Sequence, residues 1–535
     1  MSSRKTPFTL FLDILLLTSL VLAGWKYVFG LEQLLDIGLA DESAYLYRGV
    51  RLWQDGLPTA ENAPLYAIWY FFLSIIQPDR VSLYYLNYCL MAVLLPLALY
   101  VLLRRYLVNP FSAIILPFLF LISSGNLLTW PKVSHFALLI VLCTIIGVIF
   151  FQKTIVRLTI AAAGALLCSY VRPEFFLAFI ILLVGSIGYI LFNFKKERFT
   201  GVFVIFIMLL VSGGLVMWWG WPMGSGNRSF VAFGQHFSLN WVSWTNSDLS
   251  PWTDWESIIA LNFNNSQSIF AAVRNNPMLF AEHIITNMSR IPLLFVSIFF
   301  FHAAILFPSS LQRYETYLLL LIFIIYMIYV REKWISWFNA GYQKYKPELF
   351  IFASFLFPPL ISSIVIFPRQ HYLIIWGLLI LLLIAIIVFD KGVIWSGFTT
   401  KKFLMAGLLI VAITPPSSFL IMSNPQFNKD TIRFIESLHI EDQVYLLEAE
   451  GGYHYYLGDN FIRVAQYSKQ QNFDDFHKTN NINMIVLSKD LQNDSRFRSD
   501  PEWVDFLDNY ADKGYMLLEI PNTRRMLLLD QYLLK

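Results

Sequence analysis

The sequence predicts a polytopic α-helical membrane protein with about 12 to 13 transmembrane helices and a small extracytoplasmic α/β domain at its C-terminal end. Three observations lead to this fold class. Hydrophobic residues make up 57% of the 535 residues and charged residues only 14%, which excludes an ordinary soluble globule. Apolar segments of spanning length recur along residues 1–422. The character then changes, and residues 423–535 alternate like a soluble domain.

The first apolar segment, 8–30, is long enough to cross a bilayer and follows Arg4 and Lys5. Because cytoplasmic flanks carry an excess of positive charge, these two residues hold the N-terminus in the cytoplasm. The segment has no small-residue cleavage site and more spans follow it, so it is an anchor rather than a signal peptide. The chain therefore emerges from this span on the outer face.

Further spans are predicted from apolar length at 81–103, 110–124, 133–151, 156–171, 175–194, 200–220, 291–308, 316–330, 349–367, 371–389 and 402–421. Basic clusters such as Arg104-Arg105 and Lys401-Lys402 indicate cytoplasmic loops, which leaves 31–80 and 221–290 outside. Twelve spans would return the C-terminus to the cytoplasm, whereas Lys401-Lys402 directs the tail outward. One segment between 291 and 367 is therefore predicted to be re-entrant or interfacial.

Residues 423–535 predict the small outer α/β domain. Helices are expected at 430–438, 473–478 and 501–511, and strands at 443–448, 483–488, 515–520 and 526–529. This region holds 12 Lys and Arg against 18 Asp and Glu, a net charge of −6. Since the whole chain has a net charge of +3, the remaining residues carry +9. The asymmetry polarises the protein across a membrane and does not favour nucleic acid as a partner.

An acidic pair, Asp41-Glu42, follows the first span. A helix over 41–53 would place Asp41 on one face with Tyr45 and Arg48, and would gather Leu46, Val50 and Trp53 on another. A carboxylate beside the membrane surface can activate a hydroxyl nucleophile against a donor anchored in the same bilayer, such as a sugar on a lipid phosphate. The alternative is that Asp41 caps the helix and Glu42 complements its dipole.

A second motif, Glu61-Asn62-Ala63-Pro64-Leu65-Tyr66, precedes the second span. The order of first span, Asp-Glu-x-x-Tyr-x-x-x-Gly, Glu-x-x-Pro-Leu-Tyr and second span resembles the GT-C membrane glycosyltransferases. It is most similar to the protein O-mannosyltransferases and the aminoarabinose transferases that modify lipid A. The resemblance involves specific motifs over residues 8–105. Beyond residue 105 it is limited to the architecture of many spans, one long outer loop and a C-terminal outer domain. It implies a polyprenyl-phosphate-linked sugar donor, a site on the non-cytoplasmic face, and Asp41 or Glu42 as the catalytic carboxylate residue.

Two features depart from that family. The aminoarabinose transferases have a lysine before the proline of the second motif, which meets the donor phosphate, whereas this chain has Asn62 and Ala63 there. An acid that is usual between the third and fourth spans is also missing, and Lys132 and His135 in that segment could serve a phosphate instead. A divalent metal is possible but not indicated. The three cysteines, all in apolar segments, offer no disulfide framework or zinc cluster.

Two arginines at predicted outer boundaries are candidates for the donor phosphate. Arg172 stands in Arg-Pro-Glu between two apolar segments, and Arg369 stands in Phe367-Pro368-Arg369-Gln370-His371-Tyr372, similar to a Pro-Arg-Tyr stretch of many GT-C enzymes. Arginine matches phosphate oxygens with two parallel hydrogen bonds, and neutralising the leaving phosphate favours transfer. The alternative is that both are interfacial span ends, with Tyr372 in the aromatic belt.

The outer loop 221–290 and the residues before it are rich in tryptophan, with seven of the sixteen between Trp218 and Trp255. Tryptophan stacks on sugar faces, although interfacial helices explain the same pattern. Arg228 and His236 are the residues of this loop expected to contact phosphate or acceptor.

Together these features predict an inverting sugar transfer from a polyprenyl-phosphate donor to a hydroxyl on a glycan, lipid or protein, outside a bacterial inner or plasma membrane. The donor phosphate would meet Lys132, Arg172, Arg228 or Arg369. The acceptor or sugar would meet Tyr45, Arg48, Glu61, His236 or His371. One rival is a polysaccharide polymerase or ligase that relies on Arg228 and His236. The other is a flippase of lipid-linked sugars, a class that favours internal repeats, and none is found here.

Overall fold

The computed structural model describes residues 7–39, 41–107, 109–127, 131–224, 227–299, 346–389, 400–416, 418, 425–464, 472–494 and 497–534. The chain forms two compact units, and each is described by itself. The helical unit comprises Met1–Val28, Leu57–Tyr66 and Tyr88–Pro416. The mixed unit comprises Phe29–Gly56, Ala67–Asn87 and Ser417–Lys535.

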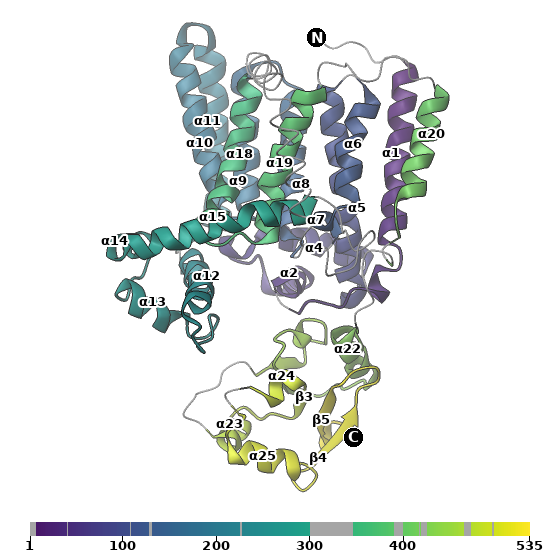
Figure 1. The fold of residues 1–535 in the computed structure, drawn as a ribbon, viewed down its shortest axis with the longest axis vertical. Coiled ribbons are helices and arrows are strands. Elements are labelled where there is room, and N and C mark those ends of the chain that lie inside the picture. The colour runs from purple at the N-terminus through teal and green to yellow at the C-terminus, as the bar shows by residue number, and fades with distance from the viewer. Residues whose placement is uncertain are drawn as a thin grey trace. The chain divides into compact units, whose positions relative to one another are not determined.

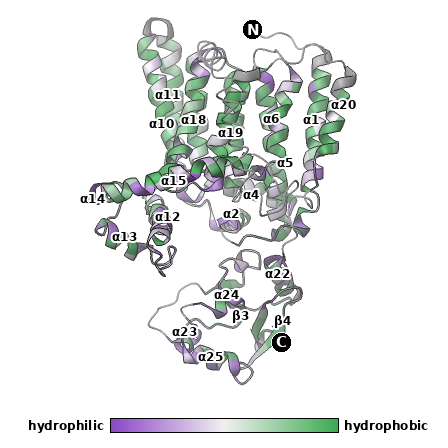
Figure 2. Ribbon diagram, in the orientation of Figure 1, coloured by the Kyte–Doolittle hydropathy of each residue, from purple (hydrophilic) through white to green (hydrophobic). Residues whose placement is uncertain are grey.

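Long apolar helices dominate the helical unit (Figure 1). Five described stretches are long and apolar enough to cross a membrane, and they lie in α1 (Pro7–Val28), α5 (Arg80–Tyr106), α10 (Phe175–Phe192), α11 (Phe194–Trp219) and α18 (Lys346–Val365). Shorter apolar helices are α6 (Pro110–Leu121), α8 (Val133–Ile149), α9 (Thr154–Ser169), α19 (Gln370–Phe389) and α20 (Thr400–Ile413). The apolar helix α4 (Pro64–Ile76) belongs to the mixed unit from Ala67 on, as does the start of α5 up to Asn87. Figure 2 shows most of them hydrophobic along their length. The prediction of a polytopic helical membrane protein is confirmed, while the predicted span 316–330 and the flanking Arg4 and Lys5 lie outside the described residues.

The outer loop forms helices of its own. These are α12 (Asn227–Thr245), α13 (Trp255–Phe263), α14 (Ile269–Asn275) and α15 (Pro277–Phe299), and buried aromatic residues of α12 pack against α13. Figure 1 shows α15 running across the direction of α18 and α19, both of which it contacts. The predicted span at 291–308 begins inside this crosswise helix, which is not among the candidate spans. Residues 300–345 lie outside the described part of the chain, so the re-entrant or interfacial segment between 291 and 367 stays a prediction.

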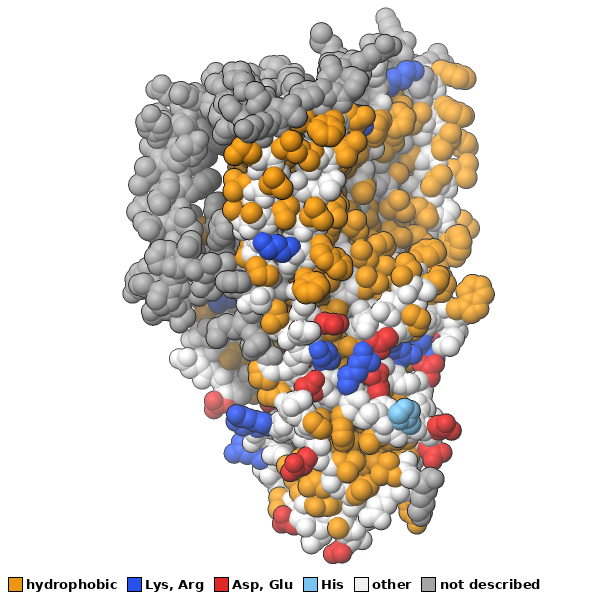
Figure 3. Space-filling model, turned by 90° about the vertical axis from the view of Figure 1, so that its right-hand side faces the viewer, with side chains coloured by type: hydrophobic (Ala, Val, Ile, Leu, Met, Phe, Trp, Pro, Cys, Tyr) orange, Lys and Arg blue, Asp and Glu red, His pale blue; other side chains and the backbone are white. Residues whose placement is uncertain are grey.

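One face of the helical unit is covered by hydrophobic side chains, as Figure 3 shows over α1 and α20. These two helices pack on each other, and their outward residues remain exposed, among them Ile14, Trp25, Met405 and Leu408. A soluble protein rarely exposes so continuous an apolar surface. Lipid is the environment that suits it.

An ion pair lies inside the helical unit. Asp13 of α1 accepts a hydrogen bond from the Tyr100 hydroxyl at 2.8 Å and pairs with Arg104, whose Nε lies 2.5 Å from Asp13 Oδ1. Both charged side chains are buried. Arg104 lies in the last turn of α5, so this pair is compatible with the predicted cytoplasmic cluster. A buried charge is tolerated when it is paired in this way.

The C-terminal part of the mixed unit contains a five-stranded sheet. Its strands are β1 (Val444–Leu447), β2 (Phe461–Arg463), β3 (Met484–Leu487), β4 (Tyr515–Glu519) and β5 (Met526–Asp530), in the order β2-β1-β3-β5-β4. β1 is parallel to β2 and β3, and β5 is antiparallel to β3 and β4. The helices are α22 (Phe427–Ser437), α23 (Phe473–Thr479), α24 (Lys489–Gln492) and α25 (Pro501–Asp508). All seven elements predicted for this region are present, and β2 and α24 were missed.

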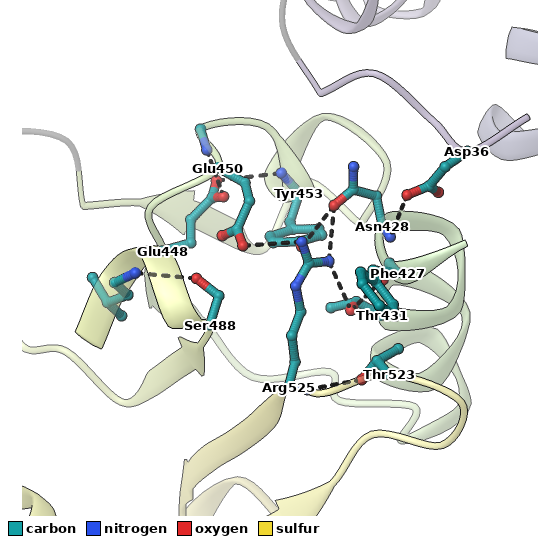
Figure 4. A network of polar contacts seen from close by, with 12 residues as sticks. Asp36, Phe427, Asn428, Thr431, Glu448, Glu450, Tyr453, Ser488, Thr523 and Arg525 are labelled. Atoms are coloured by element: carbon teal, nitrogen blue, oxygen red, sulfur yellow. Dashed lines mark hydrogen bonds and ion pairs between the residues drawn. The ribbon is translucent and has the colours of Figure 1, made fainter. Parts of the chain in front are cut away.

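N-terminal segments complete the mixed unit. They contain η1 (Leu31–Gln33), α2 (Asp41–Val50) and α3 (Leu52–Asp55). Asp36 accepts hydrogen bonds from the backbone N–H groups of Asn428 and Lys429 at 2.9 and 3.0 Å, at the start of α22 (Figure 4). Arg525 donates to Asn428 at 2.8 Å and pairs with Glu450 at 3.1 Å in the same network. The segment Phe29–Gly56 is thus part of the same compact unit as the C-terminal sheet.

Candidate active site

Helix α2 carries the acidic pair. The helix begins at Asp41 with both acids in its first turn and has Arg48 in its last, which suits the helix dipole at both ends. It ends at Val50, before the predicted limit at residue 53, and α3 follows after Arg51. The expected apolar face is correspondingly split, because Leu46 is buried whereas Trp53 is 88% exposed.

Glu42 is completely buried, with 0% exposure. Its Oε1 accepts hydrogen bonds from the Tyr70 hydroxyl at 2.5 Å and from Asn87 Nδ2 at 3.1 Å. Asn87 in turn donates to Tyr70 at 2.9 Å and accepts from Trp69 Nε1 at 2.8 Å. Sequence reasoning missed these partners, although a lone Asn near the start of an apolar span was a usable signal. The network fixes the acid-bearing end of α2.

Asp41 has different surroundings. Its side chain is exposed, and no hydrogen bond or ion pair holds its carboxylate within the described part of the chain. On the predicted face, Tyr45 is buried and the Arg48 guanidinium lies 5.9 Å from its ring centre. The Asp41 carboxylate is therefore accessible to solvent or a ligand, and the next residue, Glu42, is fixed by its hydrogen bonds.

In the helical unit, three predicted segments converge on Arg172. The guanidinium pairs with Glu174, with Nε 2.8 Å from Oε1, and donates to the Ser134 hydroxyl at 3.2 Å. It also lies 4.3 Å from the ring centre of Tyr372, at the start of α19. The Arg-Pro-Glu stretch, the segment after the third span and the Pro-Arg stretch, distant in sequence, thus meet at one place.

Arg172, Arg369 and His236 lie around His371, and these four residues are called the cationic cluster for their two guanidinium groups. Arg369 lies over the Trp252 ring at 5.7 Å, and the His236 ring lies 5.8 Å from Trp252 and 5.2 Å from Phe367. His371 is buried, with Arg172, Arg369 and His236 as charged or titratable neighbours. An excess of arginine and imidazole at one place suits an anion such as a phosphate.

Burial, followed by the charge of Arg369, lowers the pKa of His236 to about 4, so this ring is neutral near pH 7. Its Nδ1 faces the Ala232 carbonyl at 2.6 Å. Its Nε2 is buried and has no hydrogen-bond partner among the described residues. A neutral imidazole with one unused nitrogen can still accept or donate a hydrogen bond to a ligand.

A buried polar group that sequence reasoning missed holds the Pro-Arg stretch in place. His283 Nε2 lies 3.1 Å from the carbonyls of Val365 and Ile366, and Asn287 donates to the Ile364 carbonyl at 2.9 Å. Asn240 of α12 bonds both His283 and Asn287, at 2.9 and 3.1 Å. These side chains tie the outer loop to the backbone directly before Arg369.

The other predicted residues have mixed outcomes. Lys132 is completely buried and donates to the carbonyls of Asn126 and Leu127 at 2.6 and 3.1 Å, so at least two of its N–H bonds are engaged by backbone. Arg228 donates to the backbone carbonyl of Glu61, which brings the second motif and the outer loop together. Among the described residues, no three His, Cys, Asp or Glu side chains lie close enough to hold a metal ion.

No family model and no curated protein matches the chain. Four chains of solved structures do match. Among them is the crystal structure of ArnT from Cupriavidus metallidurans bound to undecaprenyl phosphate. It is 12% identical to this chain, with a TM-score of 0.42, over 98% of each chain.

Proposed function

We propose that this protein is a GT-C-type membrane glycosyltransferase, which moves a sugar from a polyprenyl-phosphate donor to an acceptor hydroxyl. It would act on the non-cytoplasmic face of a bacterial inner or plasma membrane, with residues 1–422 as the catalytic domain and 423–535 as an appended α/β domain. The observation that carries the proposal is the environment of the acid pair, since Asp41 is exposed beside a buried, hydrogen-bonded Glu42. The motifs shared with GT-C enzymes over 8–105 support it.

In the proposed mechanism Asp41 is the general base, and Glu42 is the second candidate. The carboxylate takes the proton from the acceptor hydroxyl while that oxygen attacks the anomeric carbon of the donor. The bond from that carbon to the phosphate oxygen breaks, and the lipid phosphate leaves with the bonding electrons. Because one base and a good leaving group need no covalent intermediate, the displacement inverts the anomeric centre.

The cationic cluster would bind the phosphate of the donor. Arg172 and Arg369 are the first candidates, because their guanidinium groups lie in one cluster with His236 and His371. Arg228 is the next, and Lys132 is the least favoured because its ammonium group already binds two carbonyls. Fixed cations stabilise charge that develops on a leaving group. Tyr45, Arg48, Glu61, His236 and His371 remain candidates for contacts with acceptor or sugar.

The test uses the full-length protein in detergent with a panel of polyprenyl-phosphate sugars, and follows release of free polyprenyl phosphate. We expect Asp41→Asn to lower the rate by about 10² to 10⁴-fold, the usual contribution of a general base. Glu42→Gln should lower the melting temperature as well as the rate, because the buried carboxylate accepts two hydrogen bonds.

Glu32→Gln is the matched control, since Glu32 is an exposed acid that precedes α2 in the same segment. It should keep the wild-type rate. A folded Asp41→Asn protein with full activity would remove Asp41 as the base. A folded wild-type protein that cleaves no donor in the panel would favour the polymerase or flippase alternative.

A further inference from the structure

A polar cavity of about 500 Å³ lies within the mixed unit. Its wall combines the end of α2 and the residue after it with the segment that joins β1 to β2. The residues that carry the argument are Tyr47, Arg51, His454, Tyr455, Asp459 and Arg463. The proposed transfer mechanism uses none of them.

Aromatic rings form one side of this cavity. The rings of Tyr47 and Tyr455 lie 5.2 Å apart, and those of His454 and Tyr455 lie 3.9 Å apart. The Arg51 and Arg80 guanidinium groups lie 5.4 and 5.7 Å from the centre of the Tyr47 ring and help to fix its orientation. Aromatic faces with fixed orientation pack against the C–H surface of a sugar ring.

Two arginines fix the rim through Asp459. Arg51 approaches Asp459 Oδ1 at 2.8 Å, and Arg80 approaches the same oxygen at 3.2 Å. Arg80 also donates to the Leu457 carbonyl at 2.6 Å. Asp55 also pairs with Arg51 at 2.7 Å, so the charges of these two arginines are balanced by two acids, and the charge available to a ligand is that of Arg463.

Arg463 ends β2 and brings a guanidinium to the cavity. Its nearest acid is Glu448, but Nε lies 3.7 Å from Oε1, and within the described residues Arg463 donates no side-chain hydrogen bond. The Glu448 carboxylate instead accepts hydrogen bonds from the backbone N–H groups of Gly451 and Tyr453, at 2.7 and 3.3 Å. The Arg463 side chain is 33% exposed, and because Nε is buried, the two terminal nitrogens are the donors left for an anion.

We propose that this cavity binds an acidic saccharide, with the sugar ring against Tyr47 and Tyr455 and its carboxylate or phosphate on Arg463. Tyr47 lies six residues beyond Asp41 on the same helix, a rise of about 9 Å. The two side chains lie about 120° apart around the helix axis, so only an extended acceptor would reach from the cavity around α2 to Asp41. The cavity would then be an acceptor subsite, a role that rests on the proposed function, whereas the binding itself does not.

The test measures binding to the full-length protein in lipid nanodiscs by saturation-transfer NMR and titration calorimetry. The probes are digalacturonate and mannose 6-phosphate, with galactobiose and mannose as neutral counterparts. We expect the acidic probes to bind about tenfold more tightly than the neutral ones, the worth of one charge-assisted hydrogen-bonded pair. Arg463→Gln should remove that preference, and Tyr47→Leu should weaken all the probes.

Arg498→Gln is the matched control, because Arg498 is an exposed arginine of the same unit outside the cavity. It should bind like the wild type. Folding of each variant is checked by its melting temperature, and Arg463→Lys, which keeps the charge but not the fork, should be intermediate. Equal binding of acidic and neutral probes, or a folded Arg463→Gln with unchanged preference, overturns the proposal. Probe binding by a protein that cleaves no donor supports this site and counts against the transferase function alone.

Discussion

At the scale of the residue, burial separates side chains that look equivalent in the sequence. Asp41 and Glu42 are adjacent acids, yet one is exposed and the other has 0% exposure with two hydrogen bonds. Lys132 and Arg172 are both cations between apolar segments, yet Lys132 donates to two backbone carbonyls, whereas Arg172 pairs with Glu174 and donates to the Ser134 hydroxyl. The surroundings rather than the residue type therefore decide which of these groups can act on a ligand.

The buried pair of Asp13 and Arg104 gives a first prediction. Asp13→Ala should destabilise the protein by about 3 to 5 kcal/mol, because it leaves a buried guanidinium without its acid. Arg104→Met on top of Asp13→Ala should recover a large part of that loss. The melting temperature of the four proteins in detergent completes a double-mutant cycle, and additive effects would show that the two charges do not depend on each other.

Glu448 gives a prediction about pH. Burial raises the pKa of Glu448 to about 7 from an ordinary value of 4.5. Between these two pH values the folded protein therefore keeps a proton on this carboxyl group that the unfolded chain has lost. Its contribution is fully present below pH 4.5 and is lost as pH rises through 7, on the order of 3 kcal/mol. Glu448→Gln should therefore stabilise the protein relative to wild type at pH 8 but not at pH 5. Melting curves at both values test this, and an equal shift at both pH values would contradict it.

At the scale of the element, α2 presents different faces to different partners. Glu42 bonds Tyr70 of α4, while the Ser43 hydroxyl lies 2.7 Å from that of Tyr456 in the C-terminal part of the chain. One turn on, Tyr47 contacts Tyr455. This short, polar helix is stabilised by contacts with other segments on several of its faces. The isolated sequence would not form a stable helix.

Gly49 makes the contact between α2 and α4 possible. A Cβ at this position would lie 2.4 Å from Tyr70 Cβ and 2.8 Å from the Ala67 carbonyl oxygen. Gly49→Ala should cost about 1 to 3 kcal/mol through overpacking and should lower the Asp41-dependent rate. Gly188→Ala is the matched control, because a Cβ there meets nothing within 4 Å. The prediction fails if both variants have wild-type melting temperatures.

Hydrophobic patterns explain which elements the sequence could predict. The long apolar helices were predicted from the length of their apolar runs, and β1, β3, β4, β5, α22, α23 and α25 from a regular hydrophobic pattern. β2 has three residues and α24 has four, too few to show a period. The end of α2 was placed late because the apolar pattern of 46, 50 and 53 continues past the actual end of the helix.

The site was predictable only as separate residues. Arg172 and Arg369 were named for their chemistry, but their convergence depends on contacts between segments far apart in sequence. His283 and Asn287 were not named, because a buried histidine that bonds distant carbonyls leaves no local pattern. Contacts between residues far apart in the sequence have no characteristic spacing, so they cannot be predicted from a single sequence.

At the scale of the whole molecule, the mixed unit joins three separate stretches of chain. A chain that ends at Ser423 would keep the candidate spans but would lose the partners of Asp36 and Ser43. We expect it to insert into membranes, resisting alkaline extraction, and to release no polyprenyl phosphate from its donor. A chain that ends at Asp530 is the control, since it removes only the residues beyond β5. Full activity of the shorter chain would show that the α/β part is dispensable.

The composition of the mixed unit also sets the order in which the protein can mature. Its first stretch, Phe29–Gly56, is synthesised early, and its last begins at Ser417, about 370 residues later. At about 5 to 20 residues per second, the ribosome needs roughly 20 to 70 s to cover that interval. Throughout this time the acid-bearing helix lacks the partners that the last stretch supplies, such as Tyr455 and Tyr456. Activity should therefore switch on only when synthesis is nearly complete, and chaperones or proteases of that compartment have a window in which to act on the unfinished chain.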